Sequence, residues 1–401
     1  MEKGNSEKLE ALGLEKGAQH RVSSPLHIVY ISLVDWDYIR QRCQHLALEL
    51  SRYHKVLYVW QASPVASLWY RLPLPPRHLV INENLQVLRP RVLPFHKYSP
   101  IMAINQRLML RAIRSHLPPT GADVLWLSHP WDYGYCQRLK TSLVCYDCMD
   151  NVPLLWPAPN LALLEERLLQ TADLVFATSQ SLQRRASALA SQVMLVPNAV
   201  EFSHFTRAAT EPLPVPEDLA DIPRPRIGFY GTLGHWVDLE LIEHLASACP
   251  HWSYVFIGLL QVPQFDLEVL QRLRNVHFLG VRDYDDLPAY LQHVDVWWLP
   301  FRRDEMTLDV DPLKVYEYLA AGKPVVATKL SEMEKFAPLV ELAAREDEFK
   351  ARIEAFLNQT DNEERIQARM AFAAQNTWEE RGRTIVAAIE TALSRKMDKH
   401  E

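Results

Sequence analysis

The chain has 401 residues, of which 48% are hydrophobic and 23% charged, and its formal net charge is −6. This length favours two domains, and the composition is typical of a globular protein with buried cores, which excludes disordered, collagen-like and coiled-coil chains. The acidic charge disfavours a nucleic-acid partner. Five cysteines do not support a disulfide framework and favour a reducing cytoplasm.

The amino-terminal segment, residues 1–24, is polar and carries charges of both signs. It lacks the apolar core of a signal peptide, so we expect a flexible tail. No apolar run approaches the ~18 residues that a membrane helix needs. These features predict a cytoplasmic protein.

Residues 25–205 alternate short apolar runs with amphipathic stretches, which predicts a first α/β domain. The runs are rich in β-branched and aromatic residues and have the length of strands. Strands are expected at 26–32, 56–60, 124–127, 143–146, 174–178 and 194–197, and helices at 40–53 and 161–171. Strands that alternate with helices imply a parallel sheet.

Residues 206–225 contain five prolines within a short span. Proline cannot continue a helix interior or a central strand. The segment is therefore predicted to be an interdomain linker.

The strand–helix alternation restarts over residues 226–375, which predicts a second α/β domain. Strands are expected at 227–231, 254–258, 276–279, 294–299 and 325–328, and helices at 238–249, 287–293, 314–321, 348–357, 363–374 and 378–396. The predicted fold class is α/β, with two doubly wound, Rossmann-like domains facing a cleft. Ligands of such sheets bind beyond the carboxyl ends of the strands.

The segment 299–326 combines acidic residues, a proline and a lysine around a predicted helix start. Asp311, Pro312 and Leu313 stand where the loop gives way to the helix, and Pro312 suits a first helical turn. The free N–H groups of that turn attract an anion, and Lys314 adds a full charge. Glu317, one turn later, has a carboxylate suited to the paired hydroxyls of a ribose.

This segment resembles the donor-binding region of GT-B glycosyltransferases, especially retaining family four (group 1). The family's Glu-x7-Glu pair appears here as Asp309 and Glu317, and the resemblance implies that Asp309 contacts the transferred sugar. Residues 174–205 resemble the family's strand–helix–strand ending in VPNGVD…F, and 275–280 (NVHFLG) also fits. The resemblance covers about residues 26–396 and implies that 376–397 form a helix crossing back to the first domain.

The turn after the first strand of the second domain departs from the family pattern. Relatives carry Arg and Lys there to hold the diphosphate, whereas residues 231–238 have His235 and Trp236 in those places. The resemblance therefore assigns the diphosphate to Lys314, Arg302 and Arg303, and it places Gly231 among the donor-binding residues.

The turn after NVHFLG holds the nucleobase in GT-B relatives, partly through backbone groups. The resemblance places Val281, Arg282 and Tyr284 there, although an ordinary loop is the alternative. Asp309 and Asp311 have the spacing of an Asp-x-Asp metal motif, but they lie where GT-B proteins use a helix dipole and a lysine. We therefore expect neither a metal nor a cofactor, since the nucleotide sugar is a substrate.

Residues 143–150 (LVCYDCMD) resemble the base-bearing stretch of the inverting, xanthan-type glucuronosyltransferase family, which makes Asp150 the candidate base. Its alternative role is to cap a helix. His129 matches a family histidine that approaches the donor sugar, or it is a structural histidine. Asp35 and Trp36, in the loop after the first strand, contact the acceptor or cap the following helix.

Residues 71–116 contain eight Lys or Arg side chains and a single acid, Glu83. Within them Ile101, Ile104, Leu108 and Ala112 fall on one helical face, and Arg107, Arg111 and Arg114 fall on another. Basic charge beside apolar groups is typical of a helix lying on anionic lipid. The alternative is a core-packed helix with solvated arginines.

The sequence predicts a glycosyltransferase of the hexosyltransferase type that works at the inner face of the plasma membrane. It would move a sugar from a nucleotide diphosphate to a hydroxyl of a lipid-linked glycan acceptor. The alternatives are another GT-B enzyme, such as a nucleotide-sugar epimerase, and a non-catalytic nucleotide-sugar-binding protein. Retention or inversion at the anomeric carbon stays open.

Overall fold

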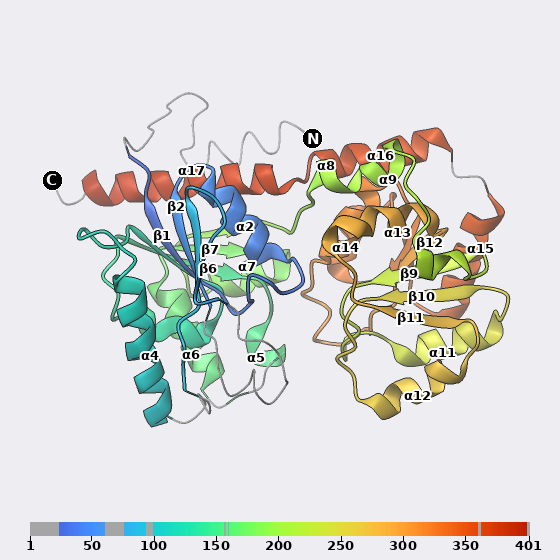
Figure 1. Ribbon diagram of the computed structural model, residues 1–401, viewed down its shortest axis with the longest axis horizontal. Helices are drawn as coiled ribbons and strands as arrows, with labels where there is room; N and C mark the ends of the chain where they lie inside the picture. Colours follow the sequence, from blue (N-terminus) through green and yellow to red (C-terminus); the bar gives the residue numbers. More distant parts are fainter. Residues whose placement is uncertain are drawn as a thin grey trace.

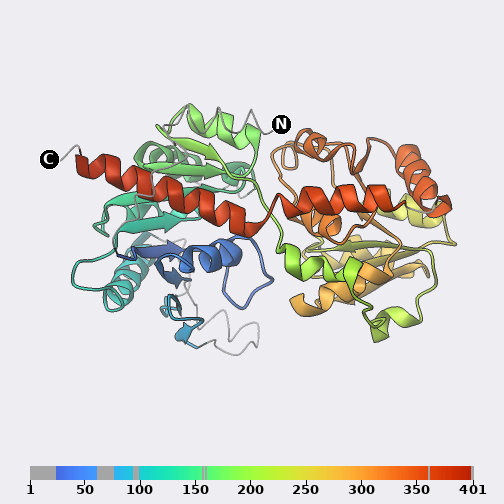
Figure 2. The ribbon, with the colours of Figure 1, turned by 90° about the horizontal axis from the view of Figure 1, so that it is seen from above.

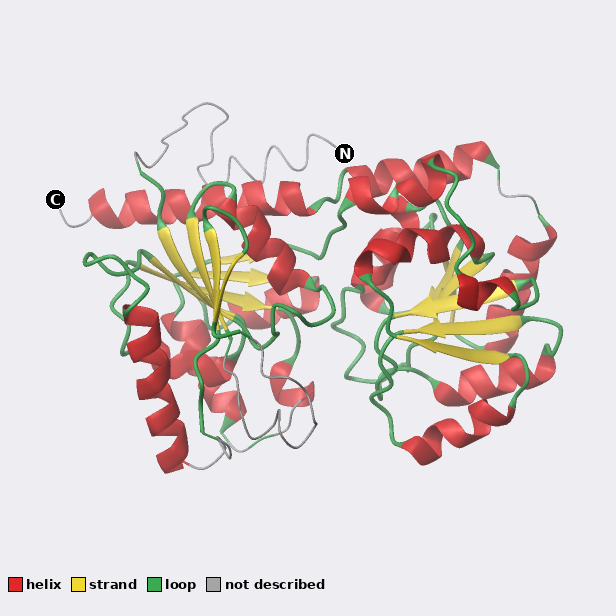
Figure 3. Cartoon of the chain, in the orientation of Figure 1, coloured by secondary structure: helices red, strands yellow, loops and turns green. Residues whose placement is uncertain are grey.

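The computed structural model describes residues 24–60, 76–93, 99–155, 158, 160–359 and 362–398. Two α/β domains lie side by side, each built around one sheet (Figures 1 and 3). The predicted fold class is confirmed. The tail expected at 1–24 lies, except for its last residue, outside the described residues.

The first domain contains an eight-stranded sheet in the order β3-β4-β2-β1-β5-β6-β7-β8. All neighbouring strands are parallel except β3 and β4. The strands are β1 (His27–Ile31), β2 (Lys55–Val59), β3 (His78–Val80), β4 (Leu85–Leu88), β5 (Val124–Leu127), β6 (Leu143–Cys148), β7 (Leu174–Ala177) and β8 (Val193–Leu195).

Helices cover both faces of this sheet, which explains why its central strands are mostly apolar. One face packs against α2 (Arg42–Ser51) and α17 (Trp378–Asp398), and the other against α4 (Ser99–Arg114), α6 (Leu161–Thr171) and α7 (Gln180–Ser187). The short α5 (Val152–Leu155) and the 3-10 helix η1 (Pro130–Tyr135) follow the carboxyl ends of β6 and β5.

The second domain contains a six-stranded parallel sheet in the order β11-β10-β9-β12-β13-β14. Its strands are β9 (Arg226–Tyr230), β10 (Ser253–Ile257), β11 (Val276–Gly280), β12 (Val296–Leu299), β13 (Val325–Thr328) and β14 (Glu341–Ala343). One face carries α11 (Leu239–Ala248), α12 (Gln264–Arg272) and α15 (Glu346–Asn358). The other carries α13 (Leu287–His293), α14 (Leu313–Ala320), α16 (Glu363–Ala374) and the 3-10 helix η3 (Ser331–Phe336); η2 (Tyr284–Asp286) precedes α13.

The proline-rich segment 206–225 is packed on the second domain. It contains α9 (Arg207–Thr210) and α10 (Glu217–Ala220), and it follows α8 (Phe202–Phe205). Ala208, Leu219 and Ile222 are buried in the core of that domain. The prolines separate short helices, and the apolar residues between them anchor the segment where we expected a simple linker.

The chain crosses between the domains twice, at neighbouring places. Val200 N–H donates to the Asn376 carbonyl at 3.0 Å, and Trp378 N–H donates to the Val200 carbonyl at 3.2 Å. From there α17 runs back along the first domain, as Figure 2 shows. It lies so close to α2 that a Cβ added to Gly382 would stand 2.6 Å from the Glu49 side chain.

Several elements were missing from the sequence prediction, among them β3, β4, α12 and β14. The strands β3 and β14 have three residues each and lie at sheet edges, where apolar alternation is too short to recognise.

The basic residues of segment 71–116 lie in different environments. Arg71 and Lys97 lie outside the described residues, and Arg89 is fully buried in an ion pair with Asp35. On α4 the side chains of Ile104 and Leu108 are 44% and 40% exposed, next to exposed Arg107. In the described ranges we find no helix with the length and apolar character that crossing a membrane requires.

Candidate functional site

Two cavities open where loops of the two domains face each other. One, of 480 Å³, is lined by residues 36–40 and Gln44 of the first domain and by 281–287 of the second. The other, of 500 Å³, is lined by Asn151, Pro153 and Leu154 on one side and by Glu305, Leu308 and Asp309 on the other. The loops follow the carboxyl ends of strands, as expected for doubly wound sheets.

Two carboxylates near the end of β6 differ sharply in environment. Asp147 is fully buried, and Arg42 donates to both its oxygens at 2.9–3.0 Å, so this pair holds α2 on the sheet. Asp150 is half-buried, and none of the described residues donates a hydrogen bond to it. Burial, reinforced by the charge of Asp147 and opposed by Arg42, raises the pKa of Asp150 to about 6.

Asp309 lies across the cleft from this strand end. Asn151, next to Asp150 in the chain, donates from Nδ2 to Asp309 Oδ2 at 3.1 Å. The predicted sugar ligand of the second domain is thereby brought to the strand end that carries the predicted base. The sequence analysis did not predict this interdomain contact of Asn151.

His129 is 1% exposed and caps η1, where its Nδ1 accepts from Trp131 N–H at 3.1 Å. Burial lowers the pKa of His129 to about 4, so the imidazole is neutral at pH 7. Its contact with a donor sugar stays a prediction, and the described geometry gives it the structural role that was the alternative.

Lys314 lies at the exposed end of an otherwise buried polar cluster on α14. Its Nζ lies 3.2 Å from Glu317 Oε2 and 4.7 Å from the centre of the Tyr230 ring. A Cβ added to Gly231 would stand 3.7 Å from Lys314 Cε, so the lysine stem runs beside the end of β9. The predicted Lys314, Glu317 and Gly231 are therefore brought together.

Glu317 is 1% exposed, and its carboxylate accepts a short hydrogen bond from the Tyr230 hydroxyl. Burial raises the pKa of Glu317, while Lys314 and Tyr230 oppose that rise. A ribose would have to displace one of these partners to reach the carboxylate. Its ribose contact stays a prediction.

Asp311 is 4% exposed and is held by protein groups on several sides. Its carboxylate accepts from Asn198 N–H at 2.5 Å and from Lys335 Nζ at 2.6 Å, and its carbonyl accepts from Asn198 Nδ2 at 2.7 Å. These bonds fix the start of α14, where Pro312 is the cap residue and Leu313 packs against the core of the first domain.

Arg302 points to solvent. Its side chain is 56% exposed, and Nε lies 3.2 Å from Asp304 Oδ2. This contact holds the guanidinium beside its own loop and does not bring it to the Lys314 cluster, so its diphosphate role stays a prediction.

The turn predicted to hold the nucleobase lines the 480 Å³ cavity. Val281 is 48% exposed there. The guanidinium of Arg282 is engaged by Asp218 and Tyr290, with Nε–O distances of 2.9 Å to each. The Tyr284 ring stacks on His204 at 4.5 Å with an interplanar angle of 9°. The groups near this turn that are available to a nucleobase are therefore the backbone and the Tyr284 and His204 rings.

The loop after β1 forms the opposite wall of this cavity. Asp35 accepts from Arg89 Nε and Nη2, each at 2.9 Å, and so anchors the loop. Trp36 packs edge-on against Tyr58 at 5.2 Å and lines the cavity. Tyr38 accepts at its hydroxyl from Gln261 Nε2 at 3.2 Å, a bridge between domains that the sequence did not reveal.

A second interdomain contact was also missed. Glu332 of η3 accepts from the N–H groups of Gln180 and Ser181 at 2.9 and 3.4 Å, and so caps α7 from the other domain. In the ranges that the structure describes, no group of three or more His, Cys, Asp and Glu side chains is arranged to hold a metal ion.

Residues 224–359 match the family model described as Glycosyl transferases group 1. The chain is also 28% identical over 321 residues to the putative teichuronic acid biosynthesis glycosyltransferase TuaH of Bacillus subtilis (strain 168), covering 73% of this chain and 78% of that protein.

Solved structures share the two-domain arrangement. An E. coli trehalose-6-phosphate structure with bound UDP-2-fluoro glucose has a TM-score of 0.70 at 13% identity, covering 91% of this chain and 99% of the other. Anabaena HepE in complex with UDP and glucose has a TM-score of 0.63 at 14% identity, with coverage of 91% and 99%. The sucrose-phosphate synthase of Thermosynechococcus elongatus has a TM-score of 0.67 at 15% identity, with coverage of 94% and 100%. The resemblance to group 1 GT-B glycosyltransferases drawn from the sequence is confirmed. The resemblance of residues 143–150 to the xanthan-type family stays a prediction.

Proposed function

We propose that this chain, a glycosyltransferase of group 1 type with the GT-B fold, transfers a hexosyl group from a nucleotide diphosphate sugar to a hydroxyl of a glycan acceptor. The observation that carries this proposal is the state of Asp150. A carboxylate with a pKa near 6, beside the cleft and without a hydrogen-bond donor among the described residues, is suited to accept a proton near neutral pH.

In an inverting reaction, Asp150 takes the proton of the acceptor hydroxyl as its oxygen attacks the anomeric carbon. The bond from that carbon to the diphosphate breaks, and its electron pair leaves with the diphosphate. Lys314 and the N–H groups at the start of α14 offset this charge, while Asp309 holds the transferred sugar. In a retaining reaction, Asp150 orients the acceptor.

The donor assignment is supported by relatives. HepE and the E. coli structure contain UDP or a UDP sugar, and the likeness of TuaH to this chain suggests a cell-surface polysaccharide as the product. The cavity between the 36–40 and 281–287 loops has rings on both walls, Trp36 and Tyr284, between which a base could stack.

We also propose that the acceptor is lipid-linked and that the first domain rests on an anionic membrane surface at its cytoplasmic side. The support is α4, whose exposed Ile104 and Leu108 lie beside Arg107, Arg111 and Arg114. This helix lies on the side of the first domain away from the second (Figure 1), so the second domain stays accessible to a water-soluble donor. Phe95 of the same basic segment, and Trp69 just before the segment, lie outside the described residues.

The decisive experiment incubates the protein with UDP-, GDP- and ADP-sugars, with and without a lipid-linked glycan acceptor, and analyses the products by mass spectrometry. Transfer that needs the acceptor supports the proposal, and the anomer formed decides between inversion and retention. Conversion of the donor sugar without an acceptor indicates an epimerase. Donor binding without any turnover indicates a non-catalytic binding protein.

A further inference from the structure

The second domain offers few cations where a donor diphosphate would lie. Lys314 is 20% exposed at the start of α14, whereas Arg302 is directed to solvent beside Asp304. The turn 231–238 contains neither Lys nor Arg. Two phosphate groups carry at least two negative charges, and taking them out of water requires compensating charge or hydrogen bonds.

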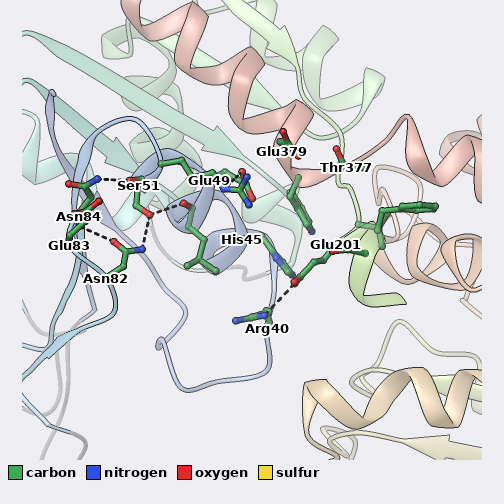
Figure 4. Close-up of a pocket in the computed structure, with 16 residues that line it drawn as sticks. Arg40, His45, Glu49, Ser51, Asn82, Glu83, Asn84, Glu201, Thr377 and Glu379 are labelled. Carbon is green, nitrogen blue, oxygen red and sulfur yellow. Dashed lines mark hydrogen bonds and ion pairs between the residues drawn. The ribbon is translucent and has the colours of Figure 1, made fainter. Parts of the chain in front are cut away.

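Arg40 reaches the same junction from the first domain. It lies in the loop between β1 and α2 and lines both the 480 Å³ cavity and a neighbouring cavity of 680 Å³. Its guanidinium lies 4.7 Å from the centre of the Tyr284 ring. Because Tyr284 belongs to the predicted nucleobase turn, this contact holds the guanidinium beside that turn. Figure 4 shows Arg40 among the residues that line the larger cavity, joined to Glu201.

The hydrogen bonds of Arg40 leave most of its capacity unused. Nη1 donates to Glu201 Oε2 at 3.4 Å, at the long end of the range for such bonds, and the two side chains are 35% and 40% exposed. Its remaining N–H groups donate to none of the described residues. A guanidinium with spare donors in a cavity wall is suited to bind phosphate oxygens in a bidentate manner.

A buried histidine, His45, lies beside the Tyr284 ring that Arg40 covers, with the two ring centres 5.9 Å apart. The imidazole is 3% exposed, stacks on Trp378 at 4.9 Å, and its Nε2 has no hydrogen-bond partner among the described residues. Burial lowers the pKa of His45 well below its ordinary value, and the charges of Arg40 and Lys314 lower it further. Both cations, one from each domain, therefore act on one buried ring.

We propose that Arg40 supplies the second cation for the donor diphosphate, across the domain interface from Lys314. This inference rests on the proposed function. On binding, Arg40 exchanges its long contact with Glu201 for phosphate oxygens while its plane stays on Tyr284. The first domain thereby provides the charge that residues 231–238 lack.

The competing explanation is that Arg40 and Glu201 form only an ion pair near the crossing between domains. Under that explanation, substituting either side chain has the same effect on binding, because removal of either one breaks the pair. If Arg40 binds the diphosphate, the two substitutions have opposite effects on binding, because Glu201 competes with the phosphate for the guanidinium. The pair therefore offers a matched control.

The experiment measures binding of UDP, GDP and ADP, and of the corresponding monophosphates, by calorimetry. Arg40→Gln is compared with Glu201→Gln and with Arg52→Gln, an arginine of the 680 Å³ cavity whose side chain is 57% exposed. We expect Arg40→Gln to weaken binding of the preferred nucleoside diphosphate about tenfold, as loss of a charge-assisted bond implies. Its monophosphate should be affected less, and the two control variants should bind as tightly as the wild type or more tightly.

Thermal unfolding of each unliganded variant checks that the fold is retained. If the wild type binds a diphosphate and Arg40→Gln binds it equally well, this inference is overturned while the proposed function stands. Equal losses in Arg40→Gln and Glu201→Gln overturn it in favour of the structural ion pair. A wild type that binds none of the nucleoside diphosphates overturns the proposed function and this inference together.

Discussion

The two domains bring charged groups to the cleft in opposite states. In the second domain, Glu317 and Asp311 are buried, and each carboxylate is hydrogen-bonded to protein partners before any ligand arrives. In the first domain, Asp150 has no hydrogen-bond donor and Arg40 donates one long hydrogen bond among the described residues. The second-domain side of the cleft is therefore preorganised, whereas the first-domain side keeps unused hydrogen-bonding capacity.

This difference matches the two tasks of a transferase. Holding a charged leaving group requires dipoles that are already in place, such as the start of α14 that the bonds of Asp311 fix, since reorganisation during the reaction raises the barrier. Removing a proton requires a group whose pKa lies near the working pH, which partial burial without a partner provides. The predictions that follow test each half separately.

The largest expected effect is on Asp150. If the enzyme inverts, Asp150→Asn should lower kcat by ~10²–10⁴-fold, the usual contribution of a general base. Binding of a nucleoside diphosphate should not change, because the donor half is untouched. Steady-state kinetics and calorimetry on one preparation measure both quantities.

The matched control is Glu305→Gln, which removes an exposed carboxylate from the wall of the 500 Å³ cavity and should leave kcat near normal. Near-normal turnover of Asp150→Asn would give Asp150 the capping role instead. Equal losses in both variants would point to the charge of the cavity as a whole.

The same substitution should make the protein more stable at neutral pH. Because the pKa of Asp150 is raised to about 6 from the ordinary 3.8, the folded state holds the proton more tightly than the unfolded state. Stability is therefore lost as the pH rises from about 4 to about 6, and the loss persists above that range. Asp150→Asn should remove this cost, roughly 1–3 kcal/mol at pH 7, and make no difference near pH 4. Urea unfolding at both pH values measures it, and an equal effect at both would show that burial of the charged carboxylate is not its cause.

The next effect concerns the second domain, which we propose binds the donor, and it is tested with Lys314→Met. We expect nucleoside diphosphate affinity to fall about tenfold, as removal of a charge-assisted bond implies. Stability should also fall, because the buried Glu317 carboxylate loses its cation. The double variant Lys314→Met/Glu317→Gln should recover stability but not affinity. Recovery of both would mean that Lys314 acts only by neutralising Glu317.

Much of the fold was predictable because long buried strands carry a strong apolar signal. The strands β5, β6 and β9 are buried from end to end and mostly apolar, and each was expected within one or two residues. The strands β3 and β14 could not be found, since three residues at a sheet edge show no reliable period. The packing of 206–225 on the second domain was hidden because prolines mask its few anchoring apolar residues.

Part of the candidate site was predictable, where residues lie directly after a strand or at a helix start. Lys314, Glu317 and Gly231 lie together as expected. Contacts between domains were not predictable, because they join residues far apart in sequence. The bond from Gln261 to Tyr38 and the capping of α7 by Glu332 depend on domain placement that no local pattern encodes.

The smallest expected effect concerns the outer surface of the first domain, away from the cleft. A single substitution, Arg107→Gln on α4, should weaken binding to vesicles containing anionic lipid about fivefold at low salt, since one basic residue near such a surface contributes about 1 kcal/mol. The apolar Ile104 and Leu108 remain, so binding should be reduced and not abolished. The matched control is Arg272→Gln on α12, whose side chain is 76% exposed on the other domain and should not face the lipid. Co-sedimentation across a salt series distinguishes the outcomes, because screening over a Debye length of ~8 Å weakens the attraction of the charges at physiological salt and above. If the wild type does not co-sediment at low salt, or if both variants lose binding equally, the arginines of α4 are a solvated face and the acceptor reaches the cleft without help from this helix.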